Sequence, residues 1–376
     1  MRGERWSRER LVPTTNSSPC SPPMAAATAP TSLLLLLLVS CTVVFSSTSE
    51  AFDYPPLVKG LSFDYYKTSC PSLESVVKKY LTQEFKKNVG LAAALLRVHF
   101  HDCFVQGCDG SILLDGSAGG PGEQDAPPNL TLRPAAFKAI NELQVLVTQA
   151  CGQTVSCADI SALAARDSVH LSGGPGYKVP FGRRDGLTFA TQAEVLNSLP
   201  PPTSNVTALL AALSKLNLDA NDLVTLSGGH TIGIGHCTSF ENRLFPSQDP
   251  NMDKTFAKNL YLTCPVKNTT NTTVLDIRTP DTFDNKYYLD LMNRQGLFTS
   301  DQDLYTNKTT KSIVLDFAVN QTLFFEKFVY SMTKMGQLSV LTGNNGEIRT
   351  NCSAINKSSK SLWSVVEDEE GRSDAL

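Results

Sequence analysis

The segment from Arg97 to Ser111 concentrates the side chains that are most able to do chemistry. Arg97 and His101 are four residues apart, so they share one face if this segment is a helix. Arginine is a permanent cation, and histidine is a base with an unperturbed pKa of about 6.5. The pair indicates acid–base chemistry in which negative charge is stabilised. His99 lies on another face and is predicted to be structural.

Oxygen-bearing residues follow this pair directly. Asp102, Asp109 and Ser111 lie close together in the sequence, and Gly107 allows the backbone to fold back between them. Side-chain and carbonyl oxygens in a tight loop are the ligands that Ca²⁺ prefers. Any one of these residues alone is more often an ordinary core or surface residue. Their combination predicts a functional site beside a calcium site.

The same segment resembles the distal signature of the plant secretory (class III) haem peroxidases. Asp222–Thr231 resembles the second signature of that family, and the similarity runs from about Leu61 to Cys352. The resemblance implies an all-α fold in which two helical domains, distal and proximal, enclose one haem b. It also implies an enzyme that uses hydrogen peroxide to oxidise small phenolic donors.

The resemblance assigns roles on the distal side of the haem by position. His101 is implied as the acid–base catalyst, Arg97 as the residue that stabilises charge, and Phe100 as the aromatic group that restricts access. Asn129 is implied to hydrogen-bond His101, with Glu123 supporting it. Pro200 is implied at the edge where donors approach.

His230 is implied as the iron ligand, and Asp301 as the carboxylate that accepts its proton and makes it a stronger electron donor. Two calcium ions are also implied. The ligands implied for the distal ion are Asp102, Val105, Gly107, Asp109 and Ser111, and those for the proximal ion are Thr231, Asp276, Thr279, Thr282 and Asp284.

The elements that carry these residues are predicted to be helical. Apolar residues recur with helical spacing from Leu73 to Phe85, and again from Phe137 to Val147. The Ala- and Leu-rich stretch 90–104 continues the pattern. Further helices are predicted over 155–170, 206–216, 221–229 and 323–335. The long connections 116–128 and 173–202 are expected to be functional loops.

Two departures from the family pattern stand out. Leu130–Ala136 replaces a turn that is shorter in many members, and is expected to affect donor choice. Tyr177 stands where the family usually has its core tryptophan, which leaves Trp6 and Trp363 outside the predicted core.

An apolar run from Leu33 to Phe45 is too short for a comfortable membrane span. Arginines precede it and small polar residues follow, which is typical of a cleaved secretion signal. Residues 1–51 are therefore predicted to be this signal and an upstream segment, with translation starting at Met1 or Met24. Residues 52–355 are predicted as the peroxidase, and 356–376 as a polar, acidic tail. We expect an extracellular or cell-wall protein, with the vacuole as the alternative.

Cysteine usage and glycosylation sequons agree with export. Of ten cysteines, Cys20 and Cys41 lie in the predicted signal, and the other eight predict four disulfides. The count alone leaves about 105 pairings open. The resemblance implies Cys70–Cys151, Cys103–Cys108, Cys157–Cys352 and Cys237–Cys264. The sequons are at Asn129, Asn205, Asn268, Asn271, Asn307, Asn320, Asn351 and Asn356.

A net charge of -3 gives no electrostatic reason to expect nucleic acid or an anionic membrane as a partner. We expect a monomer. Two competing functions remain: a non-catalytic cell-wall glycoprotein on the same scaffold, and a calcium-binding structural module. The first does not explain the complete set of active-site residues, and the second does not explain His230 and Asp301.

Overall fold

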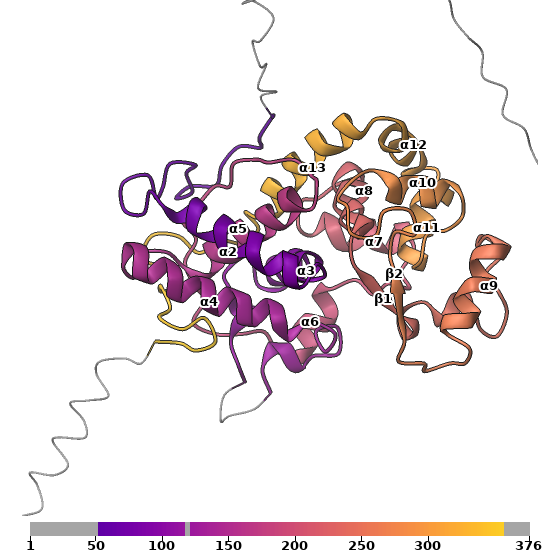
Figure 1. Cartoon of the computed structure of the whole chain (residues 1–376), viewed down its shortest axis with the longest axis horizontal. Coiled ribbons are helices and arrows are strands. Elements are labelled where there is room, and N and C mark those ends of the chain that lie inside the picture. The colour runs from indigo at the N-terminus through magenta and orange to yellow at the C-terminus, as the bar shows by residue number, and fades with distance from the viewer. Residues whose placement is uncertain (1–51, 117–120, 357–376) are drawn as a thin grey trace, which may run out of the picture. The chain divides into compact units, whose positions relative to one another are not determined.

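The computed structural model describes residues 52–116 and 121–356. The predicted signal segment, all but the first residue of the predicted tail, and both tryptophans lie outside these ranges. The described chain is mainly helical (Figure 1). Its α-helices are α2 (Leu73–Lys87), α3 (Leu91–Val105), α4 (Pro134–Cys151), α5 (Cys157–Leu171), α6 (Gln192–Ser198), α7 (Val206–Ser214), α8 (Ala220–Ser227), α9 (Lys254–Thr263), α10 (Lys286–Met292), α11 (Thr299–Thr306), α12 (Lys311–Val319) and α13 (Gln321–Met335).

The all-α prediction is confirmed, with one small addition. Strands β1 (Ile234–His236) and β2 (Thr272–Val274) form an antiparallel pair in which Gly235 lies opposite Thr273. Several short 3₁₀ helices connect the longer elements, among them η1 (Ser111–Leu113), η2 (Glu123–Asp125) and η3 (Gly228–Thr231).

Some predicted boundaries were wrong. Helix α5 begins at Cys157 rather than at 155, because the Ser156 hydroxyl caps it by accepting the Asp159 amide. The predicted helix 221–229 instead ends at Ser227, where the chain tightens into η3. Helix α7 ends at Ser214, and the connection 173–202 contains α6.

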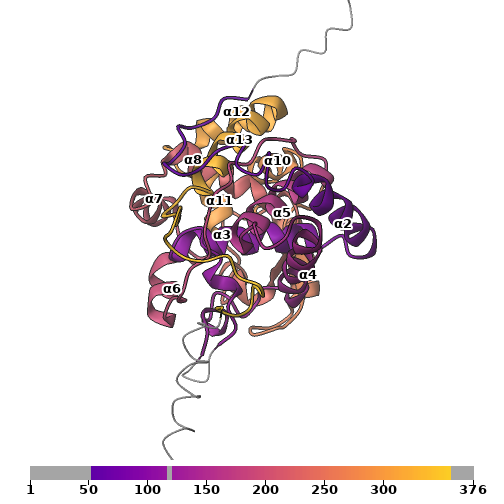
Figure 2. The ribbon, with the colours of Figure 1, turned by 90° about the vertical axis from the view of Figure 1, so that its left-hand side faces the viewer.

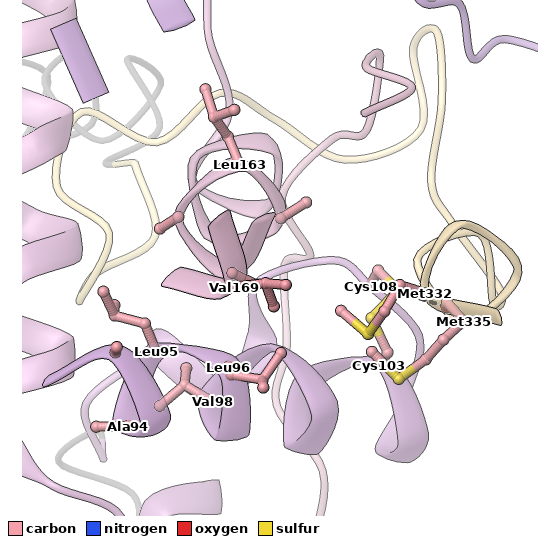
Figure 3. Packing of buried hydrophobic residues seen from close by; sticks show 14 of the residues in the cluster. Ala94, Leu95, Leu96, Val98, Cys103, Cys108, Leu163, Val169, Met332 and Met335 are labelled. Carbon is pink, nitrogen blue, oxygen red and sulfur yellow. Dashed lines mark hydrogen bonds between the residues drawn. A yellow bond between two sulfur atoms is a disulfide. The ribbon is translucent and has the colours of Figure 1, made fainter. Parts of the chain in front are cut away.

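Helix α3 is enclosed by its neighbours and packs most extensively on α5 (Figures 1 and 2). Leu95, Leu96 and Val98 of α3 are buried in the same apolar cluster as Leu163 and Val169 of α5 (Figure 3). Each fully buried side chain of this size stabilises the fold by about 1.5–3 kcal/mol. This packing fixes the helix that carries Arg97 and His101.

A second group of helices positions His230. Helix α8 is capped by Asp219, whose carboxylate accepts hydrogen bonds from the amides of Asn221 and Asp222, and the helix packs on α13. Gly228 follows this helix, and a Cβ there would collide with the Tyr288 hydroxyl and the Phe324 ring. The absence of a side chain therefore allows η3, which carries His230, to approach α10 and α13 closely.

The described residues form four disulfides, and these join the pairs that the resemblance implies. One of them links the start of α5 to the C-terminal segment across 195 residues. In the chain-entropy model, closing a loop of this length stabilises a fold by about 5 kcal/mol. The four are Cys70–Cys151, Cys103–Cys108, Cys157–Cys352 and Cys237–Cys264.

Candidate active site

His101 on α3 is held by a buried side chain from the loop after η2. Its Nδ1 lies 2.6 Å from Asn129 Oδ1, and Asn129 Nδ2 donates to the Glu123 carbonyl at 2.8 Å. The second bond fixes which end of the amide faces the imidazole. Since that end is an oxygen, Nδ1 of His101 must carry the proton. The other ring nitrogen, Nε2, is therefore left unprotonated.

Arg97 meets this same nitrogen. Its Nε donates to His101 Nε2 at 3.1 Å, and its remaining nitrogens are held by the loop on both sides of Asn129. Nη1 donates to the Thr131 carbonyl at 3.1 Å, while Nη2 donates to the Pro128 carbonyl at 3.1 Å and to Thr131 Oγ1 at 3.0 Å. The guanidinium is thus fixed beside the basic nitrogen. Sequence reasoning missed the role of Thr131.

Burial sets the charge states of this pair. Burial, reinforced by the charge of Arg97, lowers the pKa of His101 to about 3, so the imidazole is neutral at physiological pH. Burial also lowers the pKa of Arg97 to about 10, which leaves it a cation there. A neutral base and a fixed cation therefore lie side by side.

One strip of α3 remains partly accessible although most of the helix is buried. Ala93, Arg97 and Phe100 are half-buried and follow one another at helical spacing. The Phe100 ring lies edge-on to His101, with ring centroids 5.1 Å apart. This strip is the face of α3 that is open to a bound group.

His230, in η3, is also held through its Nδ1, in this case by a carboxylate. Its Nδ1 lies 2.7 Å from Asp301 Oδ1, and Asp301 is buried at the start of α11. Burial would raise the pKa of Asp301, but His230, the Phe298 amide and the Tyr287 hydroxyl together lower it below its ordinary value. Because this carboxylate is charged, the proton of His230 is on Nδ1. Nε2 makes no hydrogen bond within the described residues.

The two histidine-bearing segments approach each other. A Cβ on Gly229 would lie 3.5 Å from Leu96 Cδ2, and one on Gly233 would lie 3.0 Å from Ala93 Cβ, so η3 and the turn after it pass close to α3. The His230 side chain is 38% exposed even though its partner Asp301 is buried. An accessible imidazole with an unprotonated Nε2 would be able to bind haem iron.

The loop after α3 contains buried oxygen atoms without partners. Among the described residues, Asp102 Oδ1, Ser111 Oγ and the nearby Glu123 Oε1 accept or donate no hydrogen bond. Burial, and then the neighbouring Asp109, raise the pKa of Asp102 well above its ordinary value. Buried carboxylate oxygens that lack hydrogen-bond partners fit a cation site, and hard oxygen ligands fit calcium.

A second oxygen cluster surrounds Thr231, the residue after His230. Thr231 Oγ1 lies 3.0 Å from Asp276 Oδ2, 3.4 Å from Asp284 Oδ1 and 3.5 Å from the Thr282 carbonyl. Thr279 Oγ1 reaches the same two carboxylates at 3.5 and 3.1 Å. The structure therefore brings these five predicted residues together. Their donor set again fits calcium.

Three other predicted residues, Gly107, Val105 and Pro200, make fewer contacts that bear on their predicted roles. Gly107 has a φ of +119°, a conformation that favours glycine, and its carbonyl accepts the Asp109 amide. Val105 ends α3, and Pro200 lies half-buried just after α6. Neither has a contact that defines a role.

His99 is buried beside the Cys103–Cys108 disulfide. Among the described residues, His99, Cys103 and Cys108 form the one compact group of three or more His, Cys, Asp or Glu side chains, but both cysteine sulfurs are already bonded to each other. We therefore interpret His99 as a structural residue, as the sequence predicted.

Comparisons with known proteins agree with this geometry. The family model described as Peroxidase matches residues 77–320. The chain is 62% identical to Cationic peroxidase SPC4 of Sorghum bicolor over 86% of the chain and 90% of the relative. It is 61% identical to Peroxidase 12 of Arabidopsis thaliana over 83% and 87%, and 46% identical to Peroxidase 42 of Zea mays over 79% and 91%.

The chain therefore belongs to the peroxidase family, and within it to the plant secretory (class III) peroxidases. It is an enzyme with peroxidase activity, and family membership implies a haem cofactor, hydrogen peroxide and reducing donors. In the part of the chain that the structure describes, no helix is long and apolar enough to span a membrane.

Proposed function

We propose that this enzyme binds one haem b between the accessible strip of α3 and the imidazole of His230. The observation that carries the proposal is that both histidines hold their proton on Nδ1 and leave Nε2 unprotonated. Asn129 leaves His101 Nε2 as a neutral base, and Asp301 leaves His230 Nε2 as a ligand. A bound haem would supply the redox chemistry, which is a two-electron oxidation by peroxide followed by two one-electron reductions by donors.

The residues of the distal side would move the protons. His101 Nε2 accepts the proton from one oxygen of hydrogen peroxide and delivers it to the other oxygen, which departs as water. Arg97 stabilises the negative charge that grows on the departing oxygen, and Thr131 holds the guanidinium in place for this role. Phe100 restricts what else reaches this space.

The proximal residues would set the strength of the iron ligand. Asp301, held charged by its donors, accepts the Nδ1 proton of His230 and makes Nε2 a stronger electron donor. Asp301 would act on the iron only through His230.

We further propose two calcium ions that position these histidines. Asp102 follows His101 directly, and Thr231 follows His230 directly. Each ion would therefore anchor the neighbour of a functional histidine. The distal ligands are Asp102, Val105, Gly107, Asp109 and Ser111, and the proximal ligands are Thr231, Asp276, Thr279, Thr282 and Asp284.

Small phenols that approach the haem edge near Pro200 are the donors that we propose. The enzyme would act as a glycosylated monomer, exported to the cell wall or, alternatively, to the vacuole. Export is supported by the apolar run in residues 1–51, by the four disulfides and by the sequons.

An absorbance titration tests the proposed function. The purified protein should bind one haem per chain with a Soret band, and one equivalent of hydrogen peroxide should shift that band. A phenolic donor should then restore the original spectrum. A Soret band that peroxide leaves unchanged would support a non-catalytic protein on the same scaffold, whereas no Soret band would support a calcium-binding module.

A further inference from the structure

Asp301 receives a third hydrogen bond that the pairing with His230 does not explain. The hydroxyl of Tyr287, on α10, donates to Asp301 Oδ1 at 2.9 Å. This is the same oxygen that accepts the Nδ1 proton of His230 at 2.7 Å. The other oxygen, Oδ2, accepts the Phe298 amide at 2.9 Å. Two donors therefore share one carboxylate oxygen.

The hydroxyl of Tyr287 can act only as a donor here. The side chain is buried, and burial together with the adjacent Asp301 charge raises its pKa well above the ordinary value. Its ring lies edge-on to the His230 imidazole, with centroids 6.1 Å apart, so the tyrosine packs on both members of the pair. It stays protonated and draws electron density from the oxygen that His230 uses.

We propose that Tyr287 is a positioning residue that limits how strongly His230 donates electrons to the haem iron. This role rests on the proposed function, and it adds Tyr287 to the His230–Asp301 pair. With the hydroxyl present, Asp301 Oδ1 is a weaker acceptor, and His230 keeps more of its Nδ1 proton. Without the hydroxyl, the imidazole would gain anionic character.

The neighbouring tyrosine provides a matched control. Tyr288 is also buried on α10, and its hydroxyl also makes one hydrogen bond at 2.9 Å, but to the Val224 carbonyl of α8. Replacing either tyrosine by phenylalanine removes one buried hydrogen bond, so both variants should lose a similar amount of stability. Only Tyr287→Phe changes the environment of Asp301.

The test uses the haem-loaded enzyme and two readouts that do not depend on turnover. These are the iron–histidine stretching frequency of the ferrous protein, by resonance Raman spectroscopy, and the Fe(III)/Fe(II) potential, by spectroelectrochemistry. Tyr287→Phe should raise the frequency and make the potential more negative, while Tyr288→Phe should leave both unchanged. Asp301→Asn should shift both in the opposite direction. Adding Tyr287→Phe to Asp301→Asn should then cause little further change.

Each result is decisive. Equal values in wild type and Tyr287→Phe, or equal shifts in Tyr287→Phe and Tyr288→Phe, would overturn the inference. If Tyr287→Phe does not fold, 3-fluorotyrosine in place of Tyr287 provides a stronger donor of similar shape and must shift both readouts the other way. A wild-type enzyme without any iron–histidine stretch would instead refute His230 as the ligand, which separates failure of the proposed function from failure of this inference.

Discussion

Asn129 uses both ends of its side-chain amide inside the protein. Its oxygen lies 2.6 Å from His101 Nδ1, and its nitrogen donates to the Glu123 carbonyl at 2.8 Å. The residue is buried, yet Asn129-Leu130-Thr131 is a formal glycosylation sequon. A glycan would be attached through the nitrogen that Glu123 binds. The catalytic geometry and a glycan at this position are therefore incompatible.

We predict that the active enzyme carries no glycan at Asn129. Asn351-Cys352-Ser353 should also be poorly used, because Cys352 is in a disulfide. Glycopeptide mass spectrometry on the haem-containing fraction measures this. Substantial occupancy of Asn129 there would show that it does not hold His101. Glycans are expected at some of Asn205, Asn268, Asn271, Asn307, Asn320 and Asn356.

His99 is predicted to make stability depend on pH. Burial, and then the charge of Arg183, lower its pKa to about 3 in the folded protein, against about 6.5 when unfolded. At a pH below the pKa of His99 in the unfolded chain, the unfolded chain binds a proton that the native chain does not. The contribution of His99 is therefore complete above that pH and is lost as pH falls. From pH 6.5 to 5 the loss should be roughly 1–2 kcal/mol.

Urea unfolding at the two pH values, in wild type and in His99→Gln, measures this contribution. The variant should lose less stability on acidification than wild type does. The same pH dependence in both proteins would show that His99 is protonated in the folded state, contrary to its burial.

Removing calcium should loosen the site without removing a reactant. Exhaustive chelation should lower activity and the melting temperature and alter the Soret band, because the two oxygen clusters adjoin His101 and His230. Asp276→Asn removes a carboxylate from the proximal cluster alone and should reduce the bound calcium from two ions to one. An unchanged spectrum and melting temperature in a sample verified to be metal-free would argue against both sites.

Much of the fold was predictable where local signals agree. Long amphipathic stretches predicted α2 and α4, and η3 follows α8 close to where the predicted helix ended. Helices α9 to α12 were missed because they are short and depend on tertiary packing rather than on a long apolar stripe. Helix α6 was missed although it has a readable signal, the capping box formed by Thr191 and Glu194.

The structure brings many of the predicted site residues together, but the sequence alone did not show the contacts that hold them in place. Thr131 accepts a hydrogen bond from Arg97, yet it lies in Leu130–Ala136, which the sequence marked only as a departure from the family pattern. Tyr287 lies 14 residues before Asp301, and nothing in that spacing indicates a hydrogen bond between them. Such contacts arise from tertiary packing, so a single sequence does not show them.

The central claim is that His101 is the catalytic base and His230 the iron ligand, and two alanine variants test it directly. His101→Ala should retain haem and lose about 10²–10⁴-fold in the rate of reaction with peroxide. His230→Ala should instead lose haem on purification. The control is His170→Ala, a histidine with no assigned role, which should retain both. Equal loss of haem from His101→Ala and His230→Ala, as measured by the Soret-to-protein absorbance ratio, would contradict the account.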